Sequence, residues 1–154
     1  MPPNQTNSFA LPGSERNLPA DAELVGPCSP TASITVTLYL RARNQEELQQ
    51  RLQQLSQSHL SEQLTPEQFA NRYGADPVDL DQVRNFAQRN GLRVIEADPA
   101  RRSVKLSGSI STMQAAFGVQ LHDYRHRGST YRLRQGPVYL PTELQGIVTG
   151  VFGL

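Results

Sequence analysis

The sequence is poor in the residues that most often build reactive or cross-linked sites. It has one cysteine, Cys28, one lysine, Lys105, and no tryptophan. A single cysteine excludes an intrachain disulfide and a cluster of thiolate metal ligands. The proline-rich surroundings of Cys28, GPCSP, offer no positioned base to activate its thiol. With 15 basic and 14 acidic residues, the net charge is +1, which favours neither nucleic acid nor an anionic membrane as a partner.

Long apolar runs are also absent from the 154 residues. No run approaches the roughly 20 residues that a membrane-spanning helix needs. The N-terminal residues do not follow the basic-then-apolar order of a recognisable signal peptide. Residues 1–31 are rich in Pro, Asn, Ser and Gly and poor in aliphatic side chains. This composition predicts a flexible tail ahead of one folded domain over residues 32–154.

From residue 33 onward, strand and helix patterns alternate. The stretch ITVTLYLRAR alternates apolar and polar residues, which predicts a half-buried strand. Capping signals then predict three helices that begin after Asn44, Thr65 and Asp79. Two strands, LRVIEA and SVKLS, come next around the turn DPAR, and a short helix capped by Ser111 leads to a fourth strand, VQLHDY.

This β-α-β-β-α-β order predicts an α+β fold of the ferredoxin-like split type, in which an antiparallel sheet carries its helices on one face. The first helix is expected to bury the stripe Leu48, Leu52 and Leu55, and the other face of the sheet is left open to a partner. After VQLHDY, the sequence predicts a turn RHRGS, a strand TYRLR, an extended segment GPVYLP and a last helix over TELQGIV.

No catalytic constellation assembles from the sequence. The stretch SGSIS lacks the second glycine of a nucleophile elbow and the glycines and lysine of a phosphate loop, so we interpret it as a turn and a helix cap. His122 and His126 have an i, i+4 spacing, but they lie at a strand end and a turn, and no third ligand accompanies them. We therefore expect no catalytic residue, no metal or other cofactor, and no small-molecule ligand in this chain.

The segment RHRGSTYRLR interleaves arginines with tyrosines, a pattern that can bind RNA. The predicted strand order is also that of RNA-recognition domains, which stack bases on aromatic residues of their third strand. Here the third strand, RRSVKLSG, carries no aromatic residue. An RNA-binding module is therefore the weaker alternative, and an exposed arginine-rich hairpin is the simpler interpretation.

Several local motifs are similar, in their order along the chain, to those of a known family. They are a Tyr-Gly pair that ends the second helix, VRNFAQRNGL, RRSVKLSG, AAFGVQLH and GPVYLP. Their ordered set, from about Ser33 to Leu154, resembles the activation prodomain of kumamolisin-type sedolisins, the serine-carboxyl peptidases. The resemblance implies a ferredoxin-like propeptide of a secreted, acid-acting endopeptidase. Such a propeptide assists the folding of the catalytic domain, inhibits it, and is lost by self-cleavage in acid.

The resemblance also implies a subtilisin-like catalytic domain with a Ser-Glu-Asp triad and a calcium site. The motifs of that domain have no counterpart in this sequence, so no catalytic residue can be carried over and calcium is expected in the missing domain. The expected partner is the cognate catalytic domain, with no nucleic acid and no membrane. A stand-alone ferredoxin-like protease inhibitor is the alternative, and only the coding sequence downstream of Leu154 distinguishes it from a propeptide.

We expect the open face of the predicted sheet to bind the peptidase. Its outward side chains would be Thr35, Thr37, Tyr39, Arg41, Lys105, His122 and Tyr124. Tyrosine and arginine are among the residue types that dominate the binding energy of interfaces. Acid is expected to act on titratable groups at this face, namely Glu96, His122, Asp123 and His126.

Overall fold

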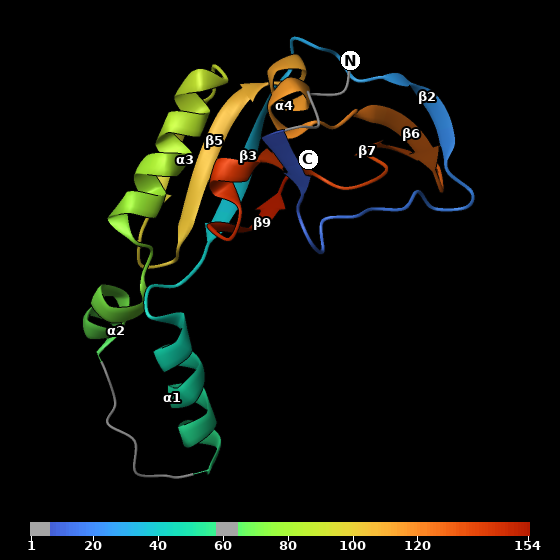
Figure 1. Ribbon diagram of the computed structural model, residues 1–154. Helices are drawn as coiled ribbons and strands as arrows, with labels where there is room; N and C mark the ends of the chain where they lie inside the picture. The colour runs from blue at the N-terminus through green and yellow to red at the C-terminus, as the bar shows by residue number, and fades with distance from the viewer. Residues whose placement is uncertain (1–6, 58–64) are drawn as a thin grey trace.

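The computed structural model describes residues 7–57 and 65–154, which form a mixed α and β fold (Figure 1). The helices are α1 (Gln45–Gln57), α2 (Pro66–Tyr73), α3 (Pro77–Arg89), α4 (Ile110–Phe117) and the 3₁₀ helix η2 (Thr142–Leu144). The strands are β1 (Ser8–Ala10), β2 (Glu23–Pro27), β3 (Ser33–Leu40), β4 (Arg93–Asp98), β5 (Ser103–Ser109), β6 (His122–His126), β7 (Ser129–Leu133), β8 (Tyr139–Pro141) and β9 (Val148–Phe152). None of the described helices is long and apolar enough to cross a membrane.

A four-stranded sheet with the order β4-β5-β3-β9 forms the centre of the fold, and every neighbouring pair in it is antiparallel. Val36 and Leu38 of β3 and Leu106 of β5 point to its inner face and are fully buried. Helices α3 and α4 cover that face, and Phe86 and Phe117 meet there with ring centroids 5.5 Å apart. The predicted α+β class with helices on one face of an antiparallel sheet is confirmed.

The fourth strand of this sheet is β9, whereas the order of the strand patterns predicts VQLHDY. Val148 and Val151 give β9 an apolar side that is 3% and 4% exposed, whereas the residues of VQLHDY that form β6 are polar on both sides of the strand. A strand over the core needs one apolar face, and β9 has it. The last helix expected over TELQGIV shortens to η2, because the chain turns at Gly146, where φ is +77°, and enters β9.

Strand β6 belongs to a second antiparallel sheet with the order β2-β6-β7. Its partner β2 lies within residues 1–31, for which the composition predicts a flexible tail. Strand β1 also lies there and pairs with β8. The Ser14 hydroxyl donates to the Leu11 carbonyl at 2.6 Å and accepts from the Val138 amide at 2.9 Å. The described part of this segment is thus held by partners roughly 100 or more residues away in the chain, which local composition does not show.

Two of the predicted helix starts are shifted. Helix α3 is capped by Asp76, whose carboxylate accepts from the Val78 amide at 2.9 Å, so Asp79 is inside the first turn and is buried. Helix α4 is capped by Ser109, which accepts from the Thr112 amide at 3.2 Å, and not by Ser111. The capping box between Thr65 and Gln68 at the start of α2 is confirmed.

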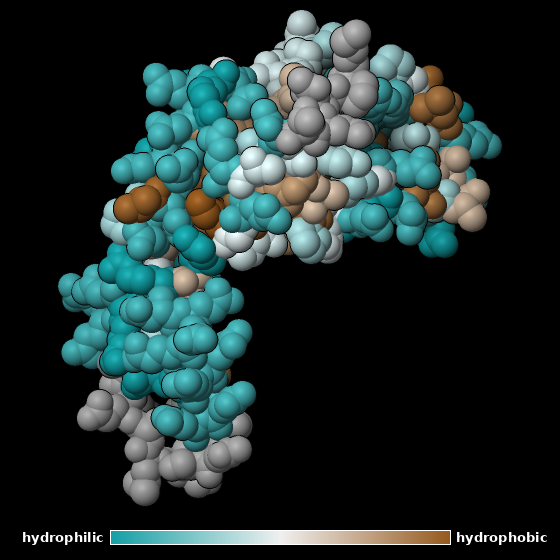
Figure 2. All heavy atoms as spheres, viewed as in Figure 1, coloured by the Kyte–Doolittle hydropathy of each residue, from teal (hydrophilic) through white to brown (hydrophobic). Residues whose placement is uncertain are grey.

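Helices α1 and α2 project from the body of the molecule (Figure 1). Asn44 has a φ of +54° and donates to the Arg72 carbonyl at 3.0 Å, so its side chain ties the start of α1 to α2. Arg72 also forms an ion pair with Glu47. Because α1 does not pack on the sheet, Leu52 of the predicted stripe is 55% exposed; the side chain of Leu55 lies outside the described set. Figure 2 shows a largely hydrophilic surface over these two helices.

Candidate functional site

The outer face of the β4-β5-β3-β9 sheet is the surface that the helices leave uncovered. Alternation along β3 puts Thr35, Thr37 and Tyr39 on this face, opposite the buried side chains of the same strand. Lys105 of β5 lies directly opposite Thr37, and Phe152 of β9 lies opposite Thr37 on its other side. The structure therefore brings four of the predicted interface residues together, and we call this surface the outer face.

An aromatic pair gives the outer face its apolar part. The rings of Tyr39 and Phe152 meet edge to face, with centroids 5.6 Å apart, and remain 41% and 53% exposed. Gly150 lies opposite Tyr39, and a Cβ atom there would approach the Phe152 ring to 2.9 Å. A glycine at this position therefore lets the Phe152 ring lie across the sheet. Ile95, at a bulge in β4, is a further exposed apolar side chain, at 48%.

An ion pair lies on the same surface. Lys105 Nζ is 3.0 Å from Glu96 Oε2, and about half of each side chain is exposed. An isolated pair of this kind adds little to stability, about 0–1 kcal/mol. Its charges are instead available to a partner.

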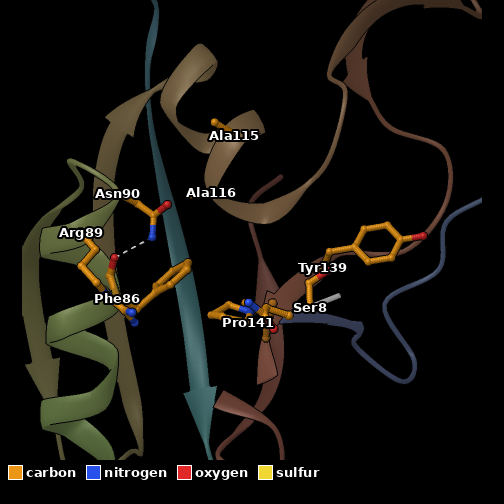
Figure 3. A pocket seen from close by; sticks show the side chains of 10 residues that line it. Ser8, Phe86, Arg89, Asn90, Ala115, Ala116, Tyr139 and Pro141 are labelled. Carbon is orange, nitrogen blue, oxygen red and sulfur yellow. Dashed lines mark hydrogen bonds between the residues drawn. The ribbon is translucent and has the colours of Figure 1, made fainter. Parts of the chain in front are cut away.

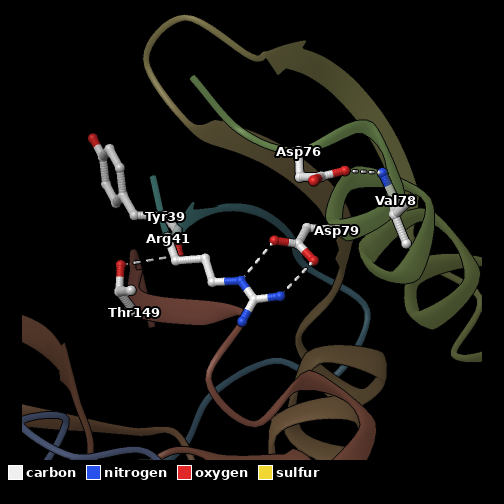
Figure 4. Close-up of polar contacts among 6 residues, drawn as sticks. All are labelled: Tyr39, Arg41, Asp76, Val78, Asp79 and Thr149. Atoms are coloured by element: carbon white, nitrogen blue, oxygen red, sulfur yellow. Dashed lines mark hydrogen bonds and ion pairs between the residues drawn. The ribbon is translucent and has the colours of Figure 1, made fainter. Parts of the chain in front are cut away.

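Arg41, also predicted for this surface, already has a partner within the domain. Its guanidinium donates to the Asp79 carboxylate through Nε–Oδ2 at 2.8 Å and Nη2–Oδ1 at 3.1 Å (Figure 4). The hydrogen bond to Asp79 raises the pKa of Arg41 above its ordinary value. Next to it, the Tyr39 carbonyl accepts from the Thr149 hydroxyl at 3.3 Å. Arg41 therefore joins the end of β3 to the first turn of α3.

His122 and Tyr124 lie on the second sheet and not on the outer face. Their rings are 6.4 Å apart, and Tyr124 lies between Leu24 of β2 and Tyr131 of β7 in the strand register. Leu24 and Tyr131 are 63% and 49% exposed, and Figure 2 shows hydrophobic surface over β2. The two predicted residues thus belong to a separate, partly apolar surface that β2 completes.

The remaining acid-response candidates, Asp123 and His126, each contact the N-terminal segment. His126 Nε2 is 2.8 Å from Asp21 Oδ1. The Cys28 thiol donates to Asp123 Oδ1 at 3.3 Å. Burial, together with this hydrogen bond and the Asp123 charge, raises the pKa of the Cys28 thiol to about 11, so it stays protonated and weakly nucleophilic.

A small pocket of about 300 Å³ lies between α3, α4 and the β1–β8 pair (Figure 3). Its walls include Phe86, Ala115 and Tyr139. Of its polar groups, Asn90 donates to the Phe86 carbonyl at 2.8 Å, and Arg89 is bound to Glu143 through bonds of 2.9 and 2.7 Å. The pocket therefore has apolar walls, and its charged side chain is already paired.

Two contributors to these surfaces are not apparent from the sequence alone. Phe152 belongs to a terminal apolar run, and its outward direction depends on the pairing of β9 with β3. Leu24 lies in a segment without visible periodicity. The β-branched residues Val148, Thr149 and Val151 are the available signal for a strand in this part of the sequence.

The sequence is similar to those of known proteins. The family model "Pro-kumamolisin, activation domain" matches residues 20–154. The chain is 32% identical over 146 residues to kumamolisin from Bacillus sp. (strain MN-32), which covers 94% of this chain and 26% of that protein. It is 28% identical over 91 residues to xanthomonalisin from Xanthomonas sp. (strain T-22), covering 59% of this chain and 11% of that protein. The chain thus spans about a quarter of the length of kumamolisin.

Proposed function

The chain belongs to the pro-kumamolisin activation domain family, and we propose that it is the propeptide of a secreted sedolisin endopeptidase, whose catalytic domain it binds. In this role it has no catalytic activity of its own. It assists the folding of the catalytic domain and keeps the precursor inactive until self-cleavage in acid. A stand-alone inhibitor of such a peptidase is the alternative, and the coding sequence downstream of Leu154 distinguishes the two.

The observation that supports this proposal most directly is the uncovered aromatic pair of Tyr39 and Phe152. Solvent-exposed aromatic side chains that pack on each other over a rigid sheet are typical anchors of protein interfaces. A standard interface buries about 800 Å² on each partner, which a four-stranded face can supply. On this face, β5 carries Ser103, Lys105 and Ser107 without a stacking aromatic, which favours a protein partner over RNA.

The folded core supports a role in assisting folding. The inner face of the sheet and helices α3 and α4 form one continuous buried cluster, so the outer face is already assembled before any partner binds. A preformed surface loses little conformational entropy on binding, which strengthens its attraction for a partly folded catalytic domain.

We attribute the release of the domain from the peptidase in acid to charges at the interface. As the pH falls, Glu96 gains a proton and its attraction for Lys105 is lost, so an unbalanced cation faces the peptidase. Groups on the second sheet, His122 and His126, gain protons as well. The charge pattern that fits the peptidase at neutral pH would thus be altered in acid.

The experiment is inhibition of the cognate mature peptidase by this domain supplied in trans. We expect Tyr39→Ala and Phe152→Ala each to raise the inhibition constant by roughly 10- to 100-fold, as loss of an interface anchor does. Phe69→Ala is the matched control, because Phe69 is an aromatic residue of similar exposure, 42%, on α2. Equal inhibition by all three variants and the wild type would remove the outer face from the interface, and absence of inhibition by the wild type would contradict the proposed function.

Two further variants test the second sheet and the pH response separately. Tyr124→Ala tests whether the second sheet also touches the peptidase. The double variant His122→Gln, His126→Gln tests the histidines: a release midpoint identical to that of the wild type would remove them from the acid response and leave Glu96 and Asp123.

A further inference from the structure

Arg134, the residue after β7, is a buried cation without an anion among the described residues. It is 6% exposed, and the other two buried polar residues of the described chain, Ser14 and Asp79, both have side-chain hydrogen bonds. Arg134 Nη1 donates to the Gly136 carbonyl at 2.6 Å. Its Nε is buried without a hydrogen-bond partner in the same part of the chain. A buried charge that lacks a counter-charge is strongly unfavourable, so this arrangement needs an explanation.

A second arginine increases the positive charge at this point. Arg16 forms an antiparallel bridge with Gly136, through N–O contacts of 3.2 and 2.9 Å. The Gly136 carbonyl therefore accepts from both the Arg16 amide and the Arg134 side chain. Burial, and then the charge of Arg16, lower the pKa of Arg134 below its ordinary value. Arg16 Nη1 donates to the Glu15 backbone carbonyl at 3.0 Å, and within the described residues the Glu15 carboxylate forms no ion pair with either arginine.

The surroundings leave room for a ligand. Gly136 also borders an open cleft of about 790 Å³. Hydroxyl and amide side chains from α4 and the neighbouring loops line this cleft, and none of its lining residues is acidic. Neither arginine lines this cleft, and Gly136, whose carbonyl accepts from Arg134 Nη1, is the residue that joins the cleft to the arginine pair.

We propose that Arg134 and Arg16 form a binding site for an oxyanion of the carboxylate type. A guanidinium presents Nε and one Nη as a planar fork that matches the two oxygens of a carboxylate. The exposed Arg16 makes the first contact, and the buried Arg134 adds an attraction that is stronger because little water screens it. The carboxylate comes either from a free anion in solution or from an Asp or Glu side chain of the peptidase, and this second source alone rests on the proposed function.

The first arm of the test measures the isolated domain with acetate as the probe. Thermal unfolding is followed as sodium chloride is replaced by sodium acetate at constant ionic strength and pH 7. A ligand that binds only the folded state raises the melting temperature, and we expect an increase of roughly 2–5 °C for the wild type. Arg134→Gln should abolish this increase, whereas Arg125→Gln, which removes an equal charge from an exposed position on β6, should retain it.

The second arm measures inhibition of the mature peptidase at neutral pH. If the peptidase supplies the carboxylate, Arg134→Gln raises the inhibition constant by at least roughly tenfold and Arg125→Gln does not. Arg134→Lys is tested alongside, because it keeps the charge and loses the planar fork. If Arg134→Gln does not fold, Arg134→Lys takes its place in both arms.

The two arms separate the possible results. A response in the acetate arm supports an anion site open to solution, and a response in the inhibition arm supports a site completed by the peptidase. No difference between Arg134→Gln and Arg125→Gln in either arm overturns the proposal. If the wild-type domain fails to inhibit the peptidase, the proposed function fails, and the acetate arm alone decides whether the anion site exists.

Discussion

Replacing Arg41 by Met is expected to destabilise the domain while leaving in place the contacts that we propose for the outer face. The Arg41 guanidinium holds both oxygens of Asp79, a carboxylate that is 4% exposed. This bond joins the residue after β3 to the first turn of α3 (Figure 4). Methionine keeps an apolar stem of similar length but leaves the buried carboxylate without a cation.

The size of the effect depends on the exposure of the two partners. Removing one partner of a fully buried ion pair costs about 3–5 kcal/mol, whereas exposed pairs contribute about 0–1 kcal/mol. The side chain of Asp79 is 5% exposed and that of Arg41 is 46% exposed, so water screens one side of the pair. We therefore expect a loss of about 2 kcal/mol. For a chain of 154 residues this is a decrease in melting temperature of roughly 4–8 °C.

The loss of stability is measured by urea unfolding of the wild type, Arg41→Met, Asp79→Leu and the double variant. The double variant should recover most of the loss, because it removes the uncompensated carboxylate along with the cation. A free energy of unfolding for Arg41→Met within about 0.5 kcal/mol of the wild type would refute the reasoning. Loss of inhibition in trans without loss of stability would place Arg41 in the interface instead.

The Cys28 thiol, with its pKa raised to about 11, should react with iodoacetamide at pH 8 at least roughly tenfold more slowly in the folded domain than in the urea-unfolded chain; equal rates would contradict the burial. Because that pKa is raised, the thiol's contribution to stability is present below the ordinary thiol pKa and is lost as the pH rises toward 11. Above about pH 9, the free energy of unfolding of the wild type should therefore fall relative to that of Cys28→Ala. The Arg89 hydrogen bond lowers the pKa of Glu143, so this pair stabilises the domain at neutral pH and stops doing so as acid protonates Glu143. Glu143→Gln should therefore lower the melting temperature by roughly 1–3 °C at pH 7 and by less at pH 3, and an equal decrease at both would exclude a charge effect.

The local sequence pattern predicts an element correctly where that element's own side chains determine its structure. The alternation in β3 matches the buried positions Val36 and Leu38, and the Thr65–Gln68 capping box marks the start of α2. Tyr39 and Lys105 lie on the outer face, as the parity of their strands predicts. These features depend on neighbours within a few residues, and the sequence displays such neighbours directly.

Features that depend on distant pairing were not visible in the sequence. His122 and Tyr124 have the alternation of a strand, but the choice between two sheets rests on whether β6 or β9 pairs with β3. The N-terminal strands are short, and their partners lie roughly 100 or more residues away. The ion-pair partner of Arg41 is Asp79, which the sequence pattern predicts to be a helix cap. In the structure the cap of α3 is Asp76, three residues earlier, and Asp79 is inside the first turn. In each case the deciding contact is tertiary.

The positions of the ionisable groups constrain how acid could release this domain without unfolding it. On the outer face, Glu96 and Lys105 form a half-exposed pair 3.0 Å apart, which under the proposed function would face the peptidase. On the second sheet, His126 Nε2 lies 2.8 Å from Asp21 Oδ1. That pair joins the segment before β2 to the end of β6, so it lies on a different sheet from the Glu96–Lys105 pair. The proposed release would then be a loss of complementarity at the interface, and the folded core need not open for it to occur.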